Sequence, residues 1–434
     1  MTPGVVRVGL LGCGNVGAAV VELIRTQADD IAARTGLRLE VARVAVRSTT
    51  KDRGVELSPE VLTHDAAGVV DDPAIDVVVE VIGGIEPARE LITSALKAGK
   101  PVVTANKELL ANVGAELFAV AEGSGVDLLF EAAVGGGIPF IRPLRESLVG
   151  EQIRRIMGIV NGTTNYILTR MTEGGVSYSE ALSEAQSLGF AERDPTADVE
   201  GFDAAAKAAI IASIAFGSRV VAGDVYHEGI SGITTADVDY AAKMGYAIKL
   251  LAIAERHDIA ESRHPTLGVR VHPAMVPASH PLASVRESFN AVFVEGDAVG
   301  ELMFYGRGAG GFPTASAVLG DLIDAAANRR RGGHASVGAL AKTTIRPIDE
   351  VETAYYINMD VVDRPGVLAS VAGVFGQHAV SIRSMEQEGL GDEARLVFIT
   401  HTAREAAVQA TLRGLHHLDA VDRITSVLRV VGTE

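Results

Sequence analysis

Residues 5–17 read VVRVGLLGCGNVG and lead into the helical pattern AAVVELIRTQADDIAAR. An aliphatic run, a glycine-rich turn and a helix, in that order, are the fingerprint of a dinucleotide-binding fold. The first glycine makes the tight turn, the second lets the backbone approach a pyrophosphate, and the third permits close packing of the helix. A tight turn that holds no phosphate is the alternative. We assign the cofactor contacts of this turn to Gly12, Gly14, Asn15, Val16 and Gly17.

Further apolar runs follow this fingerprint, with helical patterns between the later ones. They lie at residues 39–46, 76–82, 101–104 and 127–131. This alternation predicts an α/β fold with a doubly wound parallel sheet of the Rossmann type. We expect it to occupy residues 1–145.

The composition narrows the class of protein. Hydrophobic residues make up 47% and charged residues 22% of the 434 residues, which is ordinary for a soluble globular protein. A net charge of −16 repels nucleic acid and anionic membranes, so neither is expected as a partner. No apolar stretch is long enough for a membrane span, and Arg7 interrupts the first one, so we expect no signal peptide. With Cys13 as the single cysteine, a cytoplasmic location is expected.

The end of the second apolar run bears on the choice of cofactor. An acid at this place usually holds the ribose 2′-hydroxyl of NAD. This chain has Arg47 there, with Lys51 and Arg53 close behind. Because a guanidinium suits a 2′-phosphate, we expect NADP to be preferred over NAD. The alternative is that Arg47 is an ordinary surface residue of a loop.

Two later segments of this domain are candidates for the site. Lys107, in VVTANKELLA, follows a strand end, which is where open α/β sheets bind ligands, although a solvated lysine at a helix start is the alternative. Three glycines in LLFEAAVGGGIP, residues 128–139, suit a sharp exit into another domain or a backbone whose carbonyls face a ligand. Gly308 lies in GRGAGG, whose backbone can lie close to a cofactor.

The run DAAAKAAIIASIAF, residues 203–216, contains only two charged residues, Asp203 and Lys207. A helix that is apolar on nearly every face belongs in the interior, where a lysine is costly unless it is paired or has a task. One turn separates the two charges, and Glu192 and Asp198 lie just upstream. Carboxylates around one lysine suit a substrate that carries an ammonium group and receives a proton. An ordinary Asp–Lys helix pair is the alternative.

The sequence predicts that residues 146–310 form a second, α+β domain for catalysis and dimerisation. Strand patterns in GYAIKLLAIAE, LGVRVHP, NAVFVEGD and GELMFYG should form a sheet, with the helices 177–188 and 203–216 against it. Residues 311–345 predict a helix that returns to the first domain, and then a linker. The basic, glycine-containing segment 328–334 is the clearest linker pattern in the chain.

The tail has a pattern of shorter units. Residues 353–434 alternate as βαββαβ, with the turn DRPGVL at 363–368 after the first strand. This order and turn resemble the ACT domain, a small module that binds amino acids and regulates metabolic enzymes.

The chain as a whole resembles homoserine dehydrogenase. Five segments carry the resemblance in the family's order: GCGNVG, TANKE at 104–108, EAAVGGGIP at 131–139, NGTTNYI at 161–167 and LGFAERDPTADVEGFDAAAK at 188–207. It implies the reversible reduction of L-aspartate 4-semialdehyde to L-homoserine by a nicotinamide cofactor, NADP or NAD. An ACT domain on such an enzyme implies feedback inhibition by L-threonine and a homodimer or homotetramer; a purely structural dimerisation domain is the alternative.

The resemblance also implies roles for individual residues. Lys207 is similar to the catalytic proton donor, and Lys107 to the lysine near the nicotinamide and the substrate oxygen. Glu192 and Asp203 are similar to substrate-binding carboxylates, with Asp198 supporting them. Further cofactor contacts are implied at Gly189 and Gly308, and a loop for a monovalent cation, usually sodium, at Glu131, Val134, Gly136 and Ile138.

Two other functions are alternatives to homoserine dehydrogenase. Aspartate-semialdehyde dehydrogenase needs a cysteine nucleophile, and Cys13 lies inside the phosphate loop. A non-catalytic sensor of NADP and an amino acid has no need of a proton donor such as Lys207.

Overall fold

The computed structural model describes residues 4–258, 266–389, 391 and 393–432. The chain forms two compact units, which are described separately. The first comprises residues 1–156, 206–225 and 289–343, and the second comprises residues 157–205, 226–288 and 344–434.

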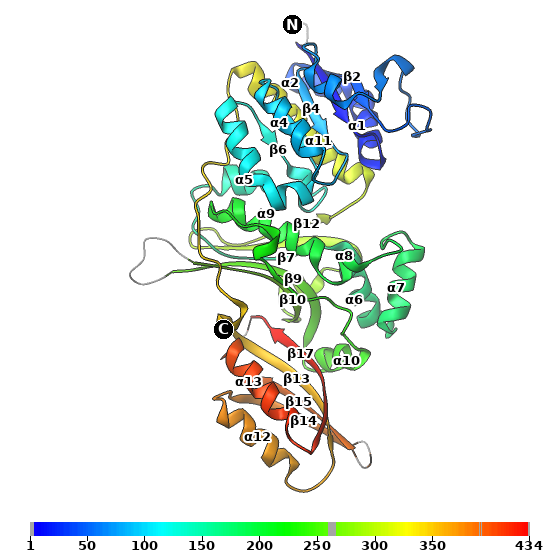
Figure 1. Ribbon diagram of the computed structural model, residues 1–434. Helices are drawn as coiled ribbons and strands as arrows, with labels where there is room; N and C mark the ends of the chain where they lie inside the picture. Colours follow the sequence, from blue (N-terminus) through cyan, green and yellow to red (C-terminus); the bar gives the residue numbers. More distant parts are fainter. Residues whose placement is uncertain (1–3, 259–265, 390, 392, 433–434) are drawn as a thin grey trace. The chain divides into compact units, whose positions relative to one another are not determined.

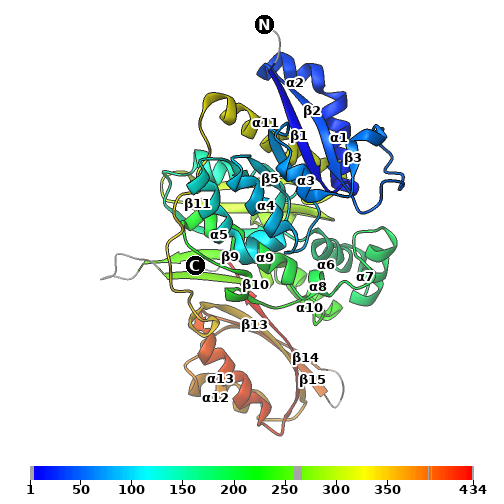
Figure 2. The same ribbon diagram turned by 45° about the horizontal axis from the view of Figure 1, so that its top comes forward.

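The first unit contains a six-stranded sheet in the order β3-β2-β1-β4-β5-β6, with every pair parallel (Figure 1). This order is typical of Rossmann folds, and it confirms the predicted doubly wound sheet. The short strand β3 was not predicted; Figure 2 shows it beside β2. The strands are β1 (Gly4–Leu11), β2 (Leu37–Ala45), β3 (Leu62–Thr63), β4 (Val77–Glu80), β5 (Val102–Thr104) and β6 (Leu128–Leu129).

Helices pack on the sheet and on each other. Helix α11 contacts α1 and four strands of the sheet, and Val318 and Leu322 of α11 join Val8 and Leu10 of β1 in one core. Helix α11 therefore packs on the sheet of the first unit. Helices α3, α4 and α5 pack in sequence against one another. The helices are α1 (Asn15–Thr26), α2 (Ala28–Thr35), α3 (Ala66–Asp71), α4 (Ala88–Lys97), α5 (Lys107–Ser124) and α11 (Gly311–Arg331).

The basic segment after residue 328 differs from the prediction. Residues 328–331 form the last turn of α11, and the linker begins only at Gly332, whose φ of 71° ends the helix. The last buried residues of α11 are Ala325 and Ala326, and the helix continues past them with basic side chains, which are favourable at the negative end of a helix dipole. Arg330 donates to the carbonyl of Gly36, so this turn of α11 contacts the first domain and is not a linker between domains.

The remaining elements of the first unit include an antiparallel hairpin of β11 (Phe289–Gly296) and β12 (Gly300–Arg307). Strand β7 (Ile153–Ile159) begins in the first unit and ends in the second. Helix α9 (Phe202–Phe216) begins in the second unit and ends in the first.

The second unit contains a sheet in the order β9-β10-β17-β13-β15-β14. Strands β10 and β17 pair in parallel at Ala274 with Arg429 and at Met275 with Val430, so the tail continues the sheet of the preceding segment. The pairing of these two strands was not predicted. The strands are β9 (Tyr246–His257), β10 (Thr266–Pro277), β13 (Glu352–Val362), β14 (Ile382–Gly389), β15 (Glu393–Thr400) and β17 (Val421–Val430), with short strands β8 (Tyr226–His227) on β10 and β16 (Ala403–Arg404) on β13.

The helices of the second unit form two groups. In the first, α6 (Gly162–Gly174) and α10 (Thr235–Lys243) pack against β9, while α7 (Tyr178–Ser187) packs on α6 as an outer layer rather than directly on the sheet as expected. In the second, α12 (Val367–Gln377) and α13 (Glu405–His416) cover one face of the four C-terminal strands (Figures 1 and 2). The predicted βαββαβ order of the tail is confirmed.

Candidate active site

A pocket of about 300 Å³ in the first unit lies at the carboxyl ends of β1, β4 and β5. Open α/β sheets bind ligands at this edge. Lys107 and Lys207 both line it, together with Val16 of the glycine-rich turn, Gly136 and Gly308. The structure thus brings together five of the predicted site residues from distant parts of the chain. The other lining residues are Val81, Ile82, Gly83, Ala105, Asn106, Ala132, Ala133, Gly135, Ala309 and Thr314.

Two of the three glycines in the glycine-rich turn, Gly12 and Gly17, have a steric reason within the protein. Gly12 has a φ of 98°, and a Cβ there would lie 2.8 Å from the carbonyl oxygen of Val81. A Cβ on Gly17 would lie 2.4 Å from the carbonyl oxygen of Gly12, whereas one on Gly14 would meet no protein atom within 4 Å. Gly14 is the N-cap of α1 and makes no side-chain hydrogen bond to its first amides, and a helix N-terminus of this kind is suited to bind an anion. Asn15, the first helical residue, is exposed there.

Lys107 is the first residue of α5, and a buried polar network positions it. Glu80, at the end of β4, accepts from Thr104 Oγ1 at 2.6 Å and from the amides of Ile82 and Gly83. Asn106 caps α5 by accepting from the amide of Leu109, and donates to the carbonyl of Gly84. Glu80 was not predicted, although the single carboxylate that ends the apolar run VVVE was a usable signal.

Helix α9 is buried over most of its length, as its composition predicts: residues 203–205 and 207–213 are buried, whereas Phe202 at its start is 52% exposed. Lys207 is 8% exposed and Asp203 is 7% exposed, and the two are four positions apart in the helix. They therefore lie on one face of the helix.

In the second unit, a bridge connects two of the predicted carboxylates. Asn161 donates its side-chain amide to Asp198 Oδ1 at 2.7 Å and to Asp203 Oδ2 at 2.9 Å. Thr163 donates to the carbonyl of Phe190 at 2.6 Å, and its hydroxyl lies 3.4 Å from Asp198 Oδ2. Asn161 also caps α6 through the amide of Thr164. The role of Asn161 as the link between the two carboxylates was not predicted.

Two predicted residues of the same region lie outside this cluster. Glu192 is exposed, and its carbonyl accepts from Gln186 Nε2 at 3.1 Å. Gly189 follows the end of α7 with a φ of 77°. A helix terminus alone explains that glycine, so a cofactor contact there stays a prediction.

Arg47 is exposed just after β2, close in sequence to a loop that Arg53 holds together. Arg53 donates to the carbonyls of Lys51, at 2.6 Å, and Ser48. Burial raises the pKa of the Cys13 thiol, and the charge of Arg53 partly opposes this. The interaction indicates that Arg53 lies near the glycine-rich turn.

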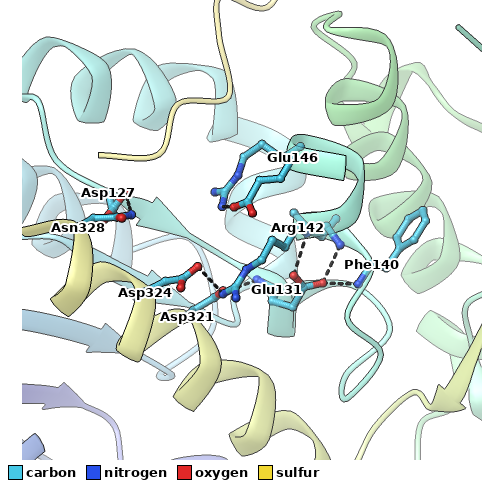
Figure 3. Close-up of polar contacts among 10 residues, drawn as sticks. Asp127, Glu131, Phe140, Arg142, Glu146, Asp321, Asp324 and Asn328 are labelled. Carbon is cyan, nitrogen blue, oxygen red and sulfur yellow. Dashed lines mark hydrogen bonds and ion pairs between the residues drawn. The ribbon is translucent and has the colours of Figure 1, made fainter. Parts of the chain in front are cut away.

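The segment after β6 is held by Glu131 and Asp321 (Figure 3). The carboxylate of Glu131 accepts from the amides of Phe140, Ile141 and Arg142, at 2.5, 2.6 and 2.8 Å. Asp321, on α11, accepts from the amide of Glu131 at 2.7 Å and from Arg142 at 3.2 Å. Because burial outweighs these bonds, the pKa of Asp321 is raised to about 7.

The predicted cation loop can offer backbone carbonyls rather than side chains. The carboxylate of Glu131 is occupied by three amides, and Val134 and Ile138 are buried aliphatic residues. Gly136 lies against Gly308, because a Cβ on Gly136 would be 2.4 Å from the carbonyl oxygen of Gly308. Within the described ranges, no group of three His, Cys, Asp or Glu side chains could hold a metal. A hard monovalent cation with carbonyl ligands fits this loop, and a transition metal does not.

A Rossmann sheet with this glycine-rich turn, and two lysines in a pocket at its carboxyl edge, are typical of an NAD(P)-dependent oxidoreductase. Three family models match in order: the NAD-binding domain of homoserine dehydrogenase at residues 12–131, homoserine dehydrogenase at 139–323, and the ACT domain at 355–416. The chain belongs to the homoserine dehydrogenase family.

Relatives agree over nearly the whole length. The homoserine dehydrogenase of Mycobacterium tuberculosis is 52% identical over 99% of this chain and 98% of its own, and that of Corynebacterium glutamicum is 52% identical over 98% and 95%. The crystal structure of a homoserine dehydrogenase from Thiobacillus denitrificans matches with a TM-score of 0.92 and 43% identity, over 99% of both chains. These matches support an enzyme over the alternative of a non-catalytic sensor. No helix in the described part of the chain is long and apolar enough to cross a membrane.

Proposed function

We propose that the pocket lined by Lys107 and Lys207 is where L-aspartate 4-semialdehyde is reduced to L-homoserine, with Lys207 as the proton donor. The observation that carries this proposal is that both lysines line the pocket that also includes the glycine-rich turn. When bound, the nicotinamide supplies the hydride. Lys207 protonates the oxygen that becomes negative, and it removes the same proton in the oxidation direction. Lys107 stabilises the negative charge on that oxygen.

The substrate's ammonium group is held by carboxylates in this proposal. Asp203 lies one turn before Lys207 on α9, and Asn161 ties it to Asp198. Two carboxylates held by one amide are a preorganised site for an ammonium group. Glu192, which is exposed, completes the set as a residue that closes on the bound substrate.

NADP is the proposed cofactor. Gly12, Gly14, Asn15, Val16 and Gly17 would hold the pyrophosphate, and Arg47, exposed after β2, would pair with the 2′-phosphate. A hyperthermophilic archaeal homoserine dehydrogenase, 29% identical with a TM-score of 0.63 over 74% of this chain, has been solved in complex with NADPH. Steady-state rates with NADP and NAD test this choice, since Arg47→Ala should lower the preference for NADP and leave the rate with NAD unchanged.

A sodium ion is the proposed ligand of the loop after β6. The carbonyls of Glu131, Val134, Gly136 and Ile138 would hold it, while the Glu131 carboxylate keeps the loop in place. Activity in sodium-free buffer, and after replacement with potassium or tetramethylammonium at equal ionic strength, tests the proposal.

L-Threonine is the proposed effector of the C-terminal module. A pocket of about 460 Å³ there is lined by Asp363, Arg364 and Gly366 of the DRPGVL turn, and by Gln387 and Leu396. Its charged and polar groups suit the ammonium and carboxylate of a small amino acid. We further propose a cytoplasmic homodimer or homotetramer, which light scattering with and without L-threonine would test.

The decisive assay for the catalytic site is homoserine oxidation by purified Lys207→Ala and Lys107→Ala. Near-native turnover of a folded Lys207→Ala variant would remove Lys207 from the proposed role.

A further inference from the structure

Arg429, near the end of β17, is a buried cation that contacts two carboxylates of different segments. It is 4% exposed. Its Nε donates to Glu405 Oε2 at 2.8 Å, and its Nη1 donates to Glu228 Oε1 at 2.9 Å. Glu405 belongs to α13 of the C-terminal module, whereas Glu228 follows β8, outside that module. One guanidinium therefore joins the module to the segment that begins at β8.

This segment is also fixed from its other sides. Strand β8 pairs with β10, and the amide of Glu228 donates to the carbonyl of Val271 at 2.8 Å. The hydroxyl of Tyr226 donates to Glu228, and the Arg429 guanidinium lies 5.6 Å from the centre of the Tyr226 ring. The Glu228 carboxylate and the backbone that carries it are therefore both held in place.

The residues after Glu228 lie against the turn that carries the proposed substrate carboxylates. The amide of Ile230 donates to the carbonyl of Val199 at 2.8 Å. A Cβ on Gly229 would lie 2.4 Å from that same carbonyl oxygen, and one on Gly201 would lie 3.1 Å from the carbonyl oxygen of Glu228. Since Asp198 and Asp203 flank residues 199–201, this contact sets the position of both carboxylates.

A second buried contact holds the far end of the same segment to the module. Asp237, on α10, is fully buried and accepts from Tyr356 Oη at 3.1 Å and from Asn358 Nδ2 at 3.2 Å, both on β13. Ser426 of β17 donates to the same carboxylate. Residues 228–237 are thus attached to the module at both ends.

The two strands that make these contacts also reach the pocket of the module. Val361 and Val362 of β13 line that pocket, and Val421 at the start of β17 pairs with Val361. The opposite end of β17 carries Arg429. A ligand that changes the pairing of β13 with β17 at the pocket therefore acts on the strand that holds Glu228.

We infer that the Glu228–Arg429 ion pair is the link through which the C-terminal module positions the turn of Asp198 and Asp203. Glu228 and Arg429 are therefore positioning residues for substrate binding. The inference rests on the proposed roles of these carboxylates and of the module's pocket as the threonine site. It assigns regulation to the affinity for homoserine, and leaves the affinity for NADP unchanged.

The test is Glu228→Gln, which removes the charge while Arg429 keeps Glu405 as its partner, so folding should be preserved. The expected result is about a tenfold higher KM for homoserine, with kcat and the KM for NADP changed less than about twofold. L-Threonine should still bind by calorimetry but no longer inhibit. The conservative Glu228→Asp should keep part of both effects. The matched control is Arg423→Gln on the same strand, which removes an ion pair with Asp360 and no contact with residues 226–230.

An unchanged homoserine KM together with unchanged inhibition in Glu228→Gln would overturn the inference. Failure of the underlying proposals would look different. If Asp198→Asn and Asp203→Asn leave the KM for homoserine unchanged, the carboxylates are misassigned. If wild-type protein neither binds nor responds to L-threonine, the effector is misassigned, and the homoserine KM of Glu228→Gln alone decides on the positioning role.

Discussion

Lys107 and Lys207 line the same pocket, although Lys107 begins helix α5 of the Rossmann domain and Lys207 lies within the apolar helix α9. Their surroundings differ, because Lys107 is exposed at its helix start and Lys207 is 8% exposed. Burial disfavours the charged form of a lysine and so favours the release of its proton, whereas an exposed ammonium keeps its charge in water. This difference is the structural reason for giving the proton to Lys207.

Replacing Lys207 should therefore remove more activity than replacing Lys107. General acid catalysis commonly contributes about 10²–10⁴-fold, so we expect Lys207→Ala to lower kcat by at least about 100-fold, with little change in the KM for NADP. Steady-state kinetics of homoserine oxidation measure this. Lys97→Ala, at an exposed helix end, is the control and should be near wild type. A larger loss in Lys107→Ala than in Lys207→Ala would reverse the assignment.

Alanine at Gly12 and alanine at Gly14 of the glycine-rich turn should affect different properties, namely stability and NADP binding. Gly12→Ala forces a side chain into a φ of 98° and against the carbonyl of Val81, so it should lower the stability by more than about 1 kcal/mol. Gly14→Ala meets no protein atom within 4 Å, so it should fold normally and bind NADP more weakly. Thermal unfolding without cofactor and a fluorescence titration with NADPH separate the two effects. Equal melting temperatures for the two variants would contradict the steric argument.

The features that the sequence predicted are those set by local chemistry. The strand–turn–helix of GCGNVG and the burial of α9 follow from short-range patterns, and the structure has both. What could not be predicted depends on contacts between distant segments. The pairing of β10 with β17 joins residues 274–275 to 429–430, and no periodicity in either strand identifies its partner.

The candidate site follows the same division. The strand end before Lys107 and the apolar run around Lys207 indicated these two residues. The bridge from Asn161 to two carboxylates could not be predicted, because it forms only where the turn at 161 meets the turn at 198. The basic run at 329–331 was wrongly predicted as part of a linker because it contains no apolar residue, although basic side chains are favourable in the last turn of a helix.

Lys249 predicts a specific pH dependence of stability. It is buried on β9, where it donates to Asn165 Oδ1 at 3.1 Å and to the carbonyl of Val285, and burial lowers its pKa from 10.5 to about 8. Between about pH 8 and pH 10.5 the unfolded chain binds this proton and the folded protein does not, so the free energy of unfolding rises with pH across that window. Below about pH 8 the charged group carries a constant penalty of about 3 kcal/mol.

Urea unfolding of wild type and Lys249→Met at pH 7.5 and pH 9.5 measures this effect. The wild type should gain stability relative to the variant at the higher pH, because other titrating groups cancel in the difference. A difference between the two proteins that does not change with pH would show that Lys249 keeps an ordinary pKa.

Asn161→Ala should weaken substrate binding without affecting the cofactor. The substitution leaves Asp198 and Asp203 without their shared donor, so their mutual repulsion moves them apart and raises the KM for homoserine, by about tenfold for a lost charge-assisted pair of hydrogen bonds. It also removes the cap of α6, which costs about 1 kcal/mol of stability. Asn161→Ser separates the two effects, because a serine still caps the helix but is too short to reach both carboxylates. The homoserine KM should rise in both variants, while the melting temperature should fall only in Asn161→Ala; a KM that recovers in Asn161→Ser would mean that the cap, and not the bridge, is what the substrate site needs.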